Sequence, residues 1–150
     1  MTHSLKLIFA VVLCLLISCL LTSCEKKVKA EKLKITDTEF ILEQNNEKTT
    51  ISLNVKGKIK NTSQYDVKSI VVTGRCNNCS EVMIAGQWFV TQQEKREAQK
   101  DTISYLAAGT EETFRFDGIA YFFRGQPGEI PESYPEGLKV YVESFETVQD

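Results

Sequence analysis

The alternation of apolar and polar residues is clearest over residues 49–61. The apolar members share one parity: Ile51, Leu53, Val55, Gly57 and Ile59. Successive side chains of a strand point to opposite faces, so this pattern predicts a half-buried β-strand. Turn-forming residues follow at 61–66 (NTSQYD), and the β-branched run at 67–73 (VKSIVVT) predicts a partner strand.

Shorter runs of the same character predict further strands at residues 33–35, 40–42, 87–91, 102–106, 113–116, 119–123 and 138–142. After the last run the apolar parity slips before Phe145, which predicts a β-bulge near Ser144. Residues 92–100 are good helix formers without an apolar stripe, which indicates an exposed loop with one helical turn at most. Many short strands separated by turns predict an all-β chain that folds as an antiparallel sandwich or barrel.

The longest irregular segment, residues 125–137, contains all three prolines. Loops on a rigid scaffold often carry binding function, so this loop with Phe122, Phe123 and Tyr134 is the candidate surface for a protein partner. The plainer interpretation is a long crossover between two sheets, whose prolines keep it from pairing as a strand.

The N-terminal segment has the layout of a secretory signal. Lys6 supplies a positive charge, and the apolar run over residues 7–21 matches the length of a signal sequence. That run is shorter than the roughly 20 residues of a bilayer-spanning helix. Residues 1–23 are therefore predicted to be a signal peptide that is removed.

An aliphatic residue and two small residues precede Cys24 (LTSC, residues 21–24), and the chain then turns polar. This motif resembles the lipobox of bacterial lipoproteins, which implies cleavage before Cys24 and attachment of lipid to its sulfur. Cys19 fits the same pattern, but cleavage there would leave Leu20 and Leu21 exposed. An ordinary secretory signal with an incidental cysteine is the alternative.

The lipid is the implied membrane contact, because two or more acyl chains suffice for stable anchoring at about 0.8 kcal/mol per buried methylene. Glu25 is not the aspartate associated with inner-membrane retention. The resemblance therefore places the protein in the bacterial cell envelope, on an outer membrane facing the periplasm where the cell has one.

Removal of the signal leaves 127 residues, enough for one domain. Residues 24–32 are charged and without periodicity, which predicts a flexible tether before a domain at 33–150. The remaining 17 basic and 20 acidic residues do not indicate binding to nucleic acid.

His3, the only histidine, lies in the segment predicted to be removed. Without histidine the chain cannot form a Ser-His-Asp or Cys-His catalytic pair or a histidine-ligated zinc site. Carboxylate-only catalysis stays formally open, but no spacing singles out a pair of acids. We therefore expect a protein that is not an enzyme and holds no metal or cofactor other than the lipid.

Cys76 and Cys79 form a C-x-x-C element that an oxidising compartment can turn into a disulfide. If Asn77 and Asn78 are the centre of a β-turn, the two Cα atoms lie within about 7 Å, which overlaps the roughly 4.4–6.8 Å range of disulfides. The alternative is a thiol-disulfide oxidoreductase, because strand, loop and C-x-x-C resemble the thioredoxin-like arrangement. That reading expects a helix over residues 80–86 and a reactive Cys76 thiol.

Four features stand in an order similar to that of FxLYD-type and related immunoglobulin-like domains: residues 55–62, 67–72, 106–109 (LAAG) and 113–114. This resemblance implies an immunoglobulin-like antiparallel β-sandwich of about seven strands over residues 33–148. The aromatic-x-Leu-Tyr-Asp signature itself is absent, since the second strand runs into residues 74–79 (GRCNNC). Such domains bind or space rather than catalyse, which leaves a binding module, a spacer or a subunit of an envelope complex as the expected function.

Overall fold

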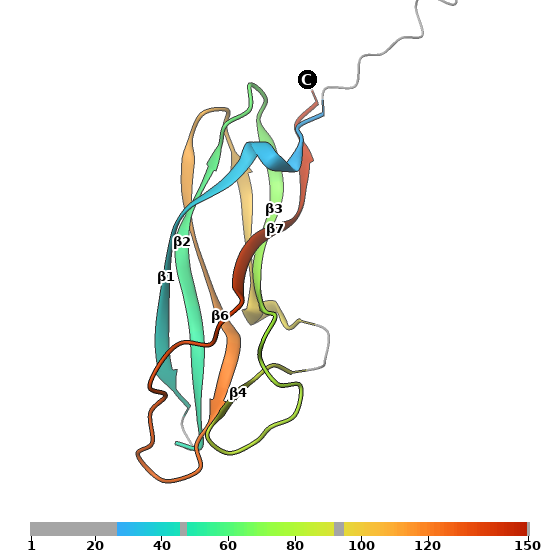
Figure 1. Ribbon diagram of the computed structural model, residues 1–150. Helices are drawn as coiled ribbons and strands as arrows, with labels where there is room; N and C mark the ends of the chain where they lie inside the picture. Colours follow the sequence, from blue (N-terminus) through green and yellow to red (C-terminus); the bar gives the residue numbers. More distant parts are fainter. Residues whose placement is uncertain (1–26, 46–47, 92–94, 150) are drawn as a thin grey trace, which may run out of the picture.

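The computed structural model describes residues 27–45, 48–91 and 95–149, a chain of strands joined by loops (Figure 1). Within this part the strands are β1 (Leu33–Gln44), β2 (Thr50–Asn61), β3 (Val67–Cys76), β4 (Gln87–Phe89), β5 (Lys100–Leu106), β6 (Glu111–Phe123) and β7 (Leu138–Thr147). The helical elements of the same residues are two 3-10 turns, η1 (Ala30–Lys32) and η2 (Glu97–Gln99). Among the described residues, no helix has the length and apolar character needed to span a membrane.

The strands form two antiparallel sheets that face each other. One sheet has the order β1-β2-β6-β4 and the other the order β5-β3-β7. The prediction of an all-β antiparallel sandwich is thereby confirmed, with seven strands in the described part. Figure 1 shows the layers extended along one long axis.

Two pairs of short predicted strands are single long strands. The strands predicted at 33–35 and 40–42 are both part of β1, and the gap expected between them is only a register shift between Ile35 and Asp37. Within β6 the chain bulges opposite Asn54, where Gly118 takes a φ of +67° that a side chain would disfavour. The apolar pattern was interrupted at these irregularities, although the pairing continues past them.

The bulge predicted near Ser144 is confirmed. Val71 lies opposite Ser144 and Val72 lies opposite Val142, so Glu143 is an extra residue on β7. This extra residue explains why the apolar parity of β7 slips before Phe145.

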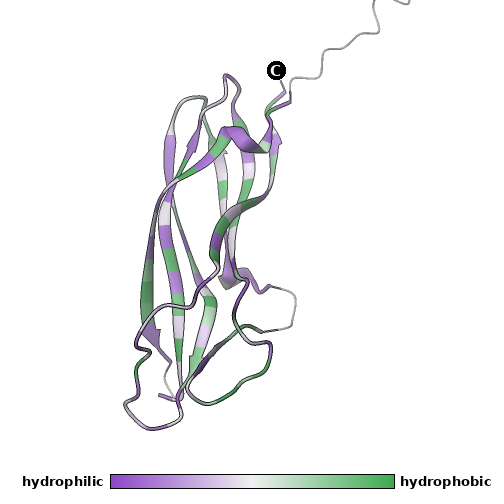
Figure 2. Ribbon diagram, viewed as in Figure 1, coloured by the Kyte–Doolittle hydropathy of each residue, from purple (hydrophilic) through white to green (hydrophobic). Residues whose placement is uncertain are grey.

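The core lies between the two sheets and consists of the residues of each strand whose side chains point inward. In β2 these residues include Leu53, Val55 and Ile59, all without exposed surface. The facing sheet contributes an equivalent set: Val67, Ile70, Val72 and Leu106. Apolar and polar residues alternate in colour along the strands in Figure 2, as a sheet with one buried face requires.

Asn61, the last residue of β2, is fully buried and joins two turns. Its Nδ2 donates to the carbonyl oxygens of Tyr65 at 2.8 Å and Leu106 at 3.2 Å. Its Oδ1 accepts from the backbone N–H of Ser63 at 3.0 Å and from the Ser63 hydroxyl at 2.7 Å. The β2–β3 turn and the end of β5 are therefore held by one side chain.

Asp66 makes a second tie at the same end of the sandwich. Its carboxylate accepts hydrogen bonds from the Tyr105 hydroxyl and from the Ala108 N–H. The Tyr105 bond, helped by the Ala108 bond, lowers the pKa of Asp66 from its ordinary value of 3.8. Because the pKa of Asp66 is lower in the folded state than in the unfolded chain, the ionised carboxylate stabilises the fold at pH values above the unfolded-state pKa. This stabilisation is lost as the pH falls through the folded-state pKa.

We therefore expect Asp66→Asn to cost stability at neutral pH and to cost progressively less as the pH falls below 3.8. Urea unfolding of both proteins at neutral pH and at about pH 2 measures this convergence. Asp37→Asn, on the exposed face of β1, is the control for loss of a charge. A stability difference between Asp66→Asn and the parent that does not change with pH would contradict the role of the carboxylate.

The folded body begins before β1. Val28 is buried in the core cluster, and its N–H donates to Thr147 Oγ1 at 2.9 Å. Within the tether predicted at 24–32, residues from Val28 onward are therefore part of the folded body, and residues 24–26 lie outside the described residues. Val28 and the C-terminal strand β7 meet at one end of the sandwich, opposite the long β3–β4 and β6–β7 loops (Figure 1).

Candidate functional site

We call the end of the sandwich opposite Val28 the distal end. It consists of the β1–β2 turn, the β3–β4 loop (residues 77–86) and the β6–β7 loop (residues 124–137). A groove separates the β1–β2 turn from the β6–β7 loop, and a second hollow lies between the two loops around Gly86 and Gly125. The distal end therefore combines long loops with two surface hollows, and two further hollows lie at the Val28 end.

The β3–β4 loop starts at a disulfide between Cys76 and Cys79, whose Cα atoms lie 5.5 Å apart. Cys76 ends β3 and belongs to the core cluster, so the bridge turns the chain outward from the sheet. Residues 81–86 form bends and a turn, and the helix expected by the thioredoxin-like interpretation is not formed there. The geometry favours a structural clamp at the base of the loop.

Because the closed loop is short, the Cys76→Ala/Cys79→Ala variant is expected to lose at most about 2 kcal/mol of unfolding free energy. Urea unfolding with and without the substitutions measures the loss. The same variant should keep the far-ultraviolet spectrum of a β-protein. Complete unfolding would contradict the view that the apolar core, and not the bridge, holds the domain together.

The β3–β4 loop is fastened to the sheets on both sides. The Ser80 N–H donates to the Trp88 carbonyl at 3.0 Å, and the Val90 N–H donates to the Ser80 carbonyl at 2.9 Å. The Gly86 N–H donates to the Phe123 carbonyl at 2.7 Å. The loop therefore has a defined path despite its lack of regular structure.

The β6–β7 loop passes from the four-stranded sheet to the three-stranded sheet, so the interpretation as a crossover is confirmed. Trp88 Nε1 donates to the Ser133 carbonyl at 3.1 Å, and the Asn77 N–H donates to the Gly137 carbonyl at 3.0 Å. These bonds join the crossover to β4 and to the first residue of the β3–β4 loop. The two loops of the distal end form one connected unit.

The three aromatic residues proposed from the sequence as a partner surface have different environments. Phe122 is only 5% exposed and packs edge-on against Trp88, with ring centroids 5.5 Å apart. Phe123 lies within β6, paired with Gln87 and Thr50. Tyr134 is 49% exposed. Phe122 is thus a core residue, and Tyr134 is the most accessible of the three.

Tyr134 also covers the edge of β1. Its hydroxyl donates to the Phe40 carbonyl at 3.2 Å, and the two rings lie 5.9 Å apart. Part of this tyrosine is therefore committed to holding the crossover against the sheet.

The partner surface predicted from the sequence, the loop 125–137, includes Ile130 but not the exposed apolar side chains of the β3–β4 loop. Val82, Met83 and Ile84 in the β3–β4 loop are 62%, 55% and 45% exposed, and Ile130 in the crossover is 69% exposed. The available signal was the apolar run 82–84 after the C-x-x-C element, which was considered as a helix start. Only the fold shows that this run faces solvent.

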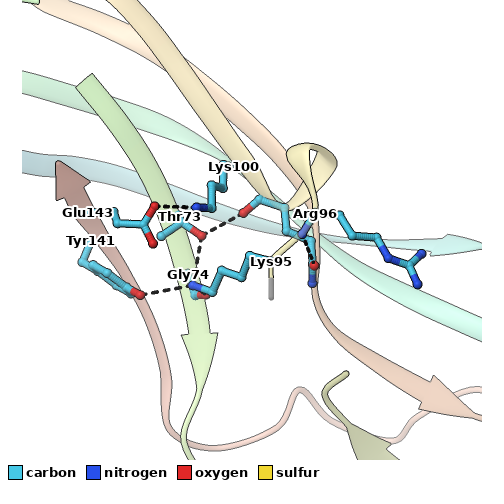
Figure 3. A network of polar contacts seen from close by, with 8 residues as sticks. Thr73, Gly74, Lys95, Arg96, Lys100, Tyr141 and Glu143 are labelled. Carbon is cyan, nitrogen blue, oxygen red and sulfur yellow. Dashed lines mark hydrogen bonds and ion pairs between the residues drawn. The ribbon is translucent and has the colours of Figure 1, made fainter. Parts of the chain in front are cut away.

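A polar network beside the distal end, drawn in Figure 3, is centred on Lys95. Its ammonium donates to the Gly74 carbonyl at 2.6 Å, to Thr73 Oγ1 at 3.0 Å and to the Tyr141 hydroxyl at 3.1 Å. The neighbouring Lys100 pairs with Glu143 at 2.8 Å. Lys95 uses all three donors on protein acceptors, so the network fastens the β4–β5 connection to the three-stranded sheet.

Residues 92–94, part of the predicted exposed loop 92–100, lie outside the described residues. Glu97–Gln99 form the 3-10 turn η2, which agrees with the expectation of one short helical turn, and Lys100 already begins β5. In the described ranges no group of three or more His, Cys, Asp or Glu side chains is arranged to hold a metal ion.

Fold and distal end together define the class of the molecule as an all-β antiparallel sandwich with a disulfide-clamped loop. No protein-family model, curated protein or solved structure matches the chain.

Proposed function

We propose that this protein is a lipoprotein of the bacterial cell envelope, anchored by lipid on Cys24, whose immunoglobulin-like sandwich is a non-catalytic binding module. Cys24 and the signal at 1–23 lie outside the described residues, and the lipobox motif supports this part of the proposal. The observation that carries the binding role is the placement of exposed apolar side chains at the end opposite Val28.

An anchor at Cys24 would be attached to the end of the sandwich opposite the distal end. Residues 24–27 span at most roughly 14 Å when extended, so lipid on Cys24 would hold the Val28 end near the membrane. The 13 residues of β6 extend the body by about 40 Å along its long axis. The distal end would then face away from the membrane, where a partner in the periplasm can reach it.

The non-catalytic part of the proposal rests on the composition of the chain after cleavage. His3 would be lost with the signal, and several lysines and acids of the sandwich form ion pairs on exposed strand faces, such as Lys56 with Glu39 at 2.9 Å. Such exposed pairs are ordinary features of a sheet surface.

Mass spectrometry of the protein purified from membranes tests the proposal. We expect a mature chain that begins at Cys24 and carries the mass of two or three acyl chains. An unmodified chain, or one that begins at any other residue, would overturn the anchored lipoprotein.

A further inference from the structure

We propose that the groove between the β1–β2 turn and the crossover binds a small ligand that carries an oxyanion group, a carboxylate or a phosphate, on a short aliphatic chain. This inference rests on the proposed binding function and deepens it by naming the chemical class of the ligand. We call this surface the distal groove. One wall is formed by residues 44, 48 and 49, and the other by residues 124–128 and 130.

The distal groove has the size of a small-molecule site. Its volume is about 720 Å³, and pockets that hold small ligands measure roughly 300–1,000 Å³. Hydrogen bonds join its two walls. The Arg124 N–H donates to the Thr49 carbonyl at 3.0 Å, and Arg124 Nη1 donates to the Lys48 carbonyl at 3.1 Å. The groove is therefore a fixed feature of the folded body.

The Arg124 guanidinium has hydrogen-bonding capacity that the protein does not use. In the described part of the chain its one side-chain hydrogen bond is that from Nη1 to the Lys48 carbonyl, and its Nε is buried without a partner. Proteins pair nearly all of their buried polar groups, so an unpaired one needs an explanation. A guanidinium binds carboxylate and phosphate through charge-assisted hydrogen bonds. An oxyanion at the remaining N–H groups of Arg124 would compensate its charge.

Lys48 brings a second cation to the same groove. Its side chain is exposed, and over the described ranges neither Lys48 nor Arg124 forms an ion pair. The two residues face each other across the groove and are in contact through the Lys48 carbonyl. Like charges repel each other, whereas an anion placed between them is attracted by both. The groove is therefore prepared for a negative group.

The nearest acids are turned toward other partners. Glu43 accepts from Asn54 Nδ2 at 2.7 Å and lies 3.7 Å from Arg115. Glu129 accepts two backbone N–H groups of the crossover, at 2.6 Å and 3.1 Å, and lines the neighbouring hollow. The other described charged residues of the distal end do not line the groove: Arg75, Glu81, Glu132, Glu136 and Lys139. Among the described residues, the charges that line it are the two cations.

The apolar part of the groove selects the body of the ligand. Pro127 and Ile130 line it, and Ile130 is 69% exposed, so its side chain is available for contact. None of the described lining residues is aromatic, so a base or a sugar ring would find no stacking partner. An aliphatic chain needs only apolar contact. A ligand that joins such a chain to an oxyanion uses both the apolar wall and the cations.

A nuclear magnetic resonance titration of residues 24–150 carrying Cys24→Ser, which keeps every described residue, tests the proposal. Hexanoate and hexyl phosphate should each shift the amide signals of Lys48, Thr49, Gly125 and Gly128, and the shifts should saturate. Hexan-1-ol lacks the oxyanion and should bind about tenfold more weakly or worse. Acetyl-alanyl-leucine carries the same chemistry on a peptide, and its affinity relative to hexanoate tells a peptide C-terminus from a free small acid.

Variants of the two cations locate the site. Lys48→Gly should weaken hexanoate binding about threefold and keep the fold, because Lys48 has a φ of +59° that glycine adopts readily. Arg124→Gln should weaken binding about tenfold, since it removes a charged donor. Glu47→Gln in the same turn and Lys34→Gln at the opposite end of β1 are the controls and should stay within about twofold.

Several outcomes would overturn the oxyanion site. These are the absence of saturable shifts with every probe, equal binding of hexan-1-ol and hexanoate, shifts centred away from the distal groove, and unchanged affinity in both Lys48→Gly and Arg124→Gln. The mass of the N-terminus tests the anchor separately. A chain acylated on Cys24 whose groove binds none of these probes would overturn the ligand class alone, and a chain that binds them without acylation would overturn the anchor alone.

Discussion

Cys24→Ser is expected to abolish the incorporation of fatty acid into this protein. A thioether-linked lipid requires the sulfur of the lipobox cysteine, and a serine hydroxyl at the same position does not replace it. Because each buried methylene contributes about 0.8 kcal/mol, loss of two or more acyl chains removes the whole anchoring energy. Labelling of growing cells with an alkyne analogue of palmitate, followed by purification of the protein, measures the change from full to no label.

Cys19→Ser is the matched control for this experiment. Cys19 follows an aliphatic residue and a small one, as Cys24 does, and lies five residues upstream in the same apolar segment. The control is expected to keep the label. Loss of label from Cys19→Ser with retention in Cys24→Ser would move the anchor to Cys19 and leave the hydrophobic Leu20 and Leu21 on the mature chain.

Asn61→Ala is expected to lower the free energy of unfolding by about 2–4 kcal/mol. The substitution removes a buried amide that serves four partners, from Ser63 and Tyr65 in the β2–β3 turn to Leu106 at the end of β5. The carbonyl of Leu106 would be left buried without this donor, and leaving a buried polar group unsatisfied costs about 1–3 kcal/mol by itself. Urea unfolding measures the loss, with a fall in Tm on the order of 10 °C.

Asn45→Ala is the comparison for Asn61→Ala. Asn45 also accepts backbone N–H bonds, from Thr49 and Thr50 at 3.1 Å each, but it lies at a more exposed turn where water can replace it. Its loss should cost about 1 kcal/mol or less. Equal losses in the two variants would show that burial of Asn61 does not set the size of the effect.

These interactions divide the sandwich into two ends with different roles. Asn61, Asp66 and Val28 fix the end where the N-terminus leaves the body. The opposite end exposes its apolar side chains on loops that are fastened at their bases. This division would suit the anchored binding module that we propose, because one end would carry the attachment while the other end stays accessible.

The alternation in residues 49–61 was sufficient to predict the strand β2, its buried face and the all-β class. The slip of parity before Phe145 located the bulge at residues 143–144, since an extra residue on one strand reverses every side chain after it. The close spacing of Cys76 and Cys79 similarly sufficed for the disulfide. All three features depend on geometry within a few residues of the chain.

Tertiary structure alone decided which side chains lie at the surface of the distal end. Phe122 seemed from the sequence to be a contact residue, yet Trp88 from β4 covers it, while the apolar run at Val82 has no strand over it. The burial of Val28 and Asn61 likewise depends on segments far away, β7 for the first and β5 for the second. Periodicity reports which residues share a face, but it carries no information on which distant segment covers that face, and exposure depends on that covering segment.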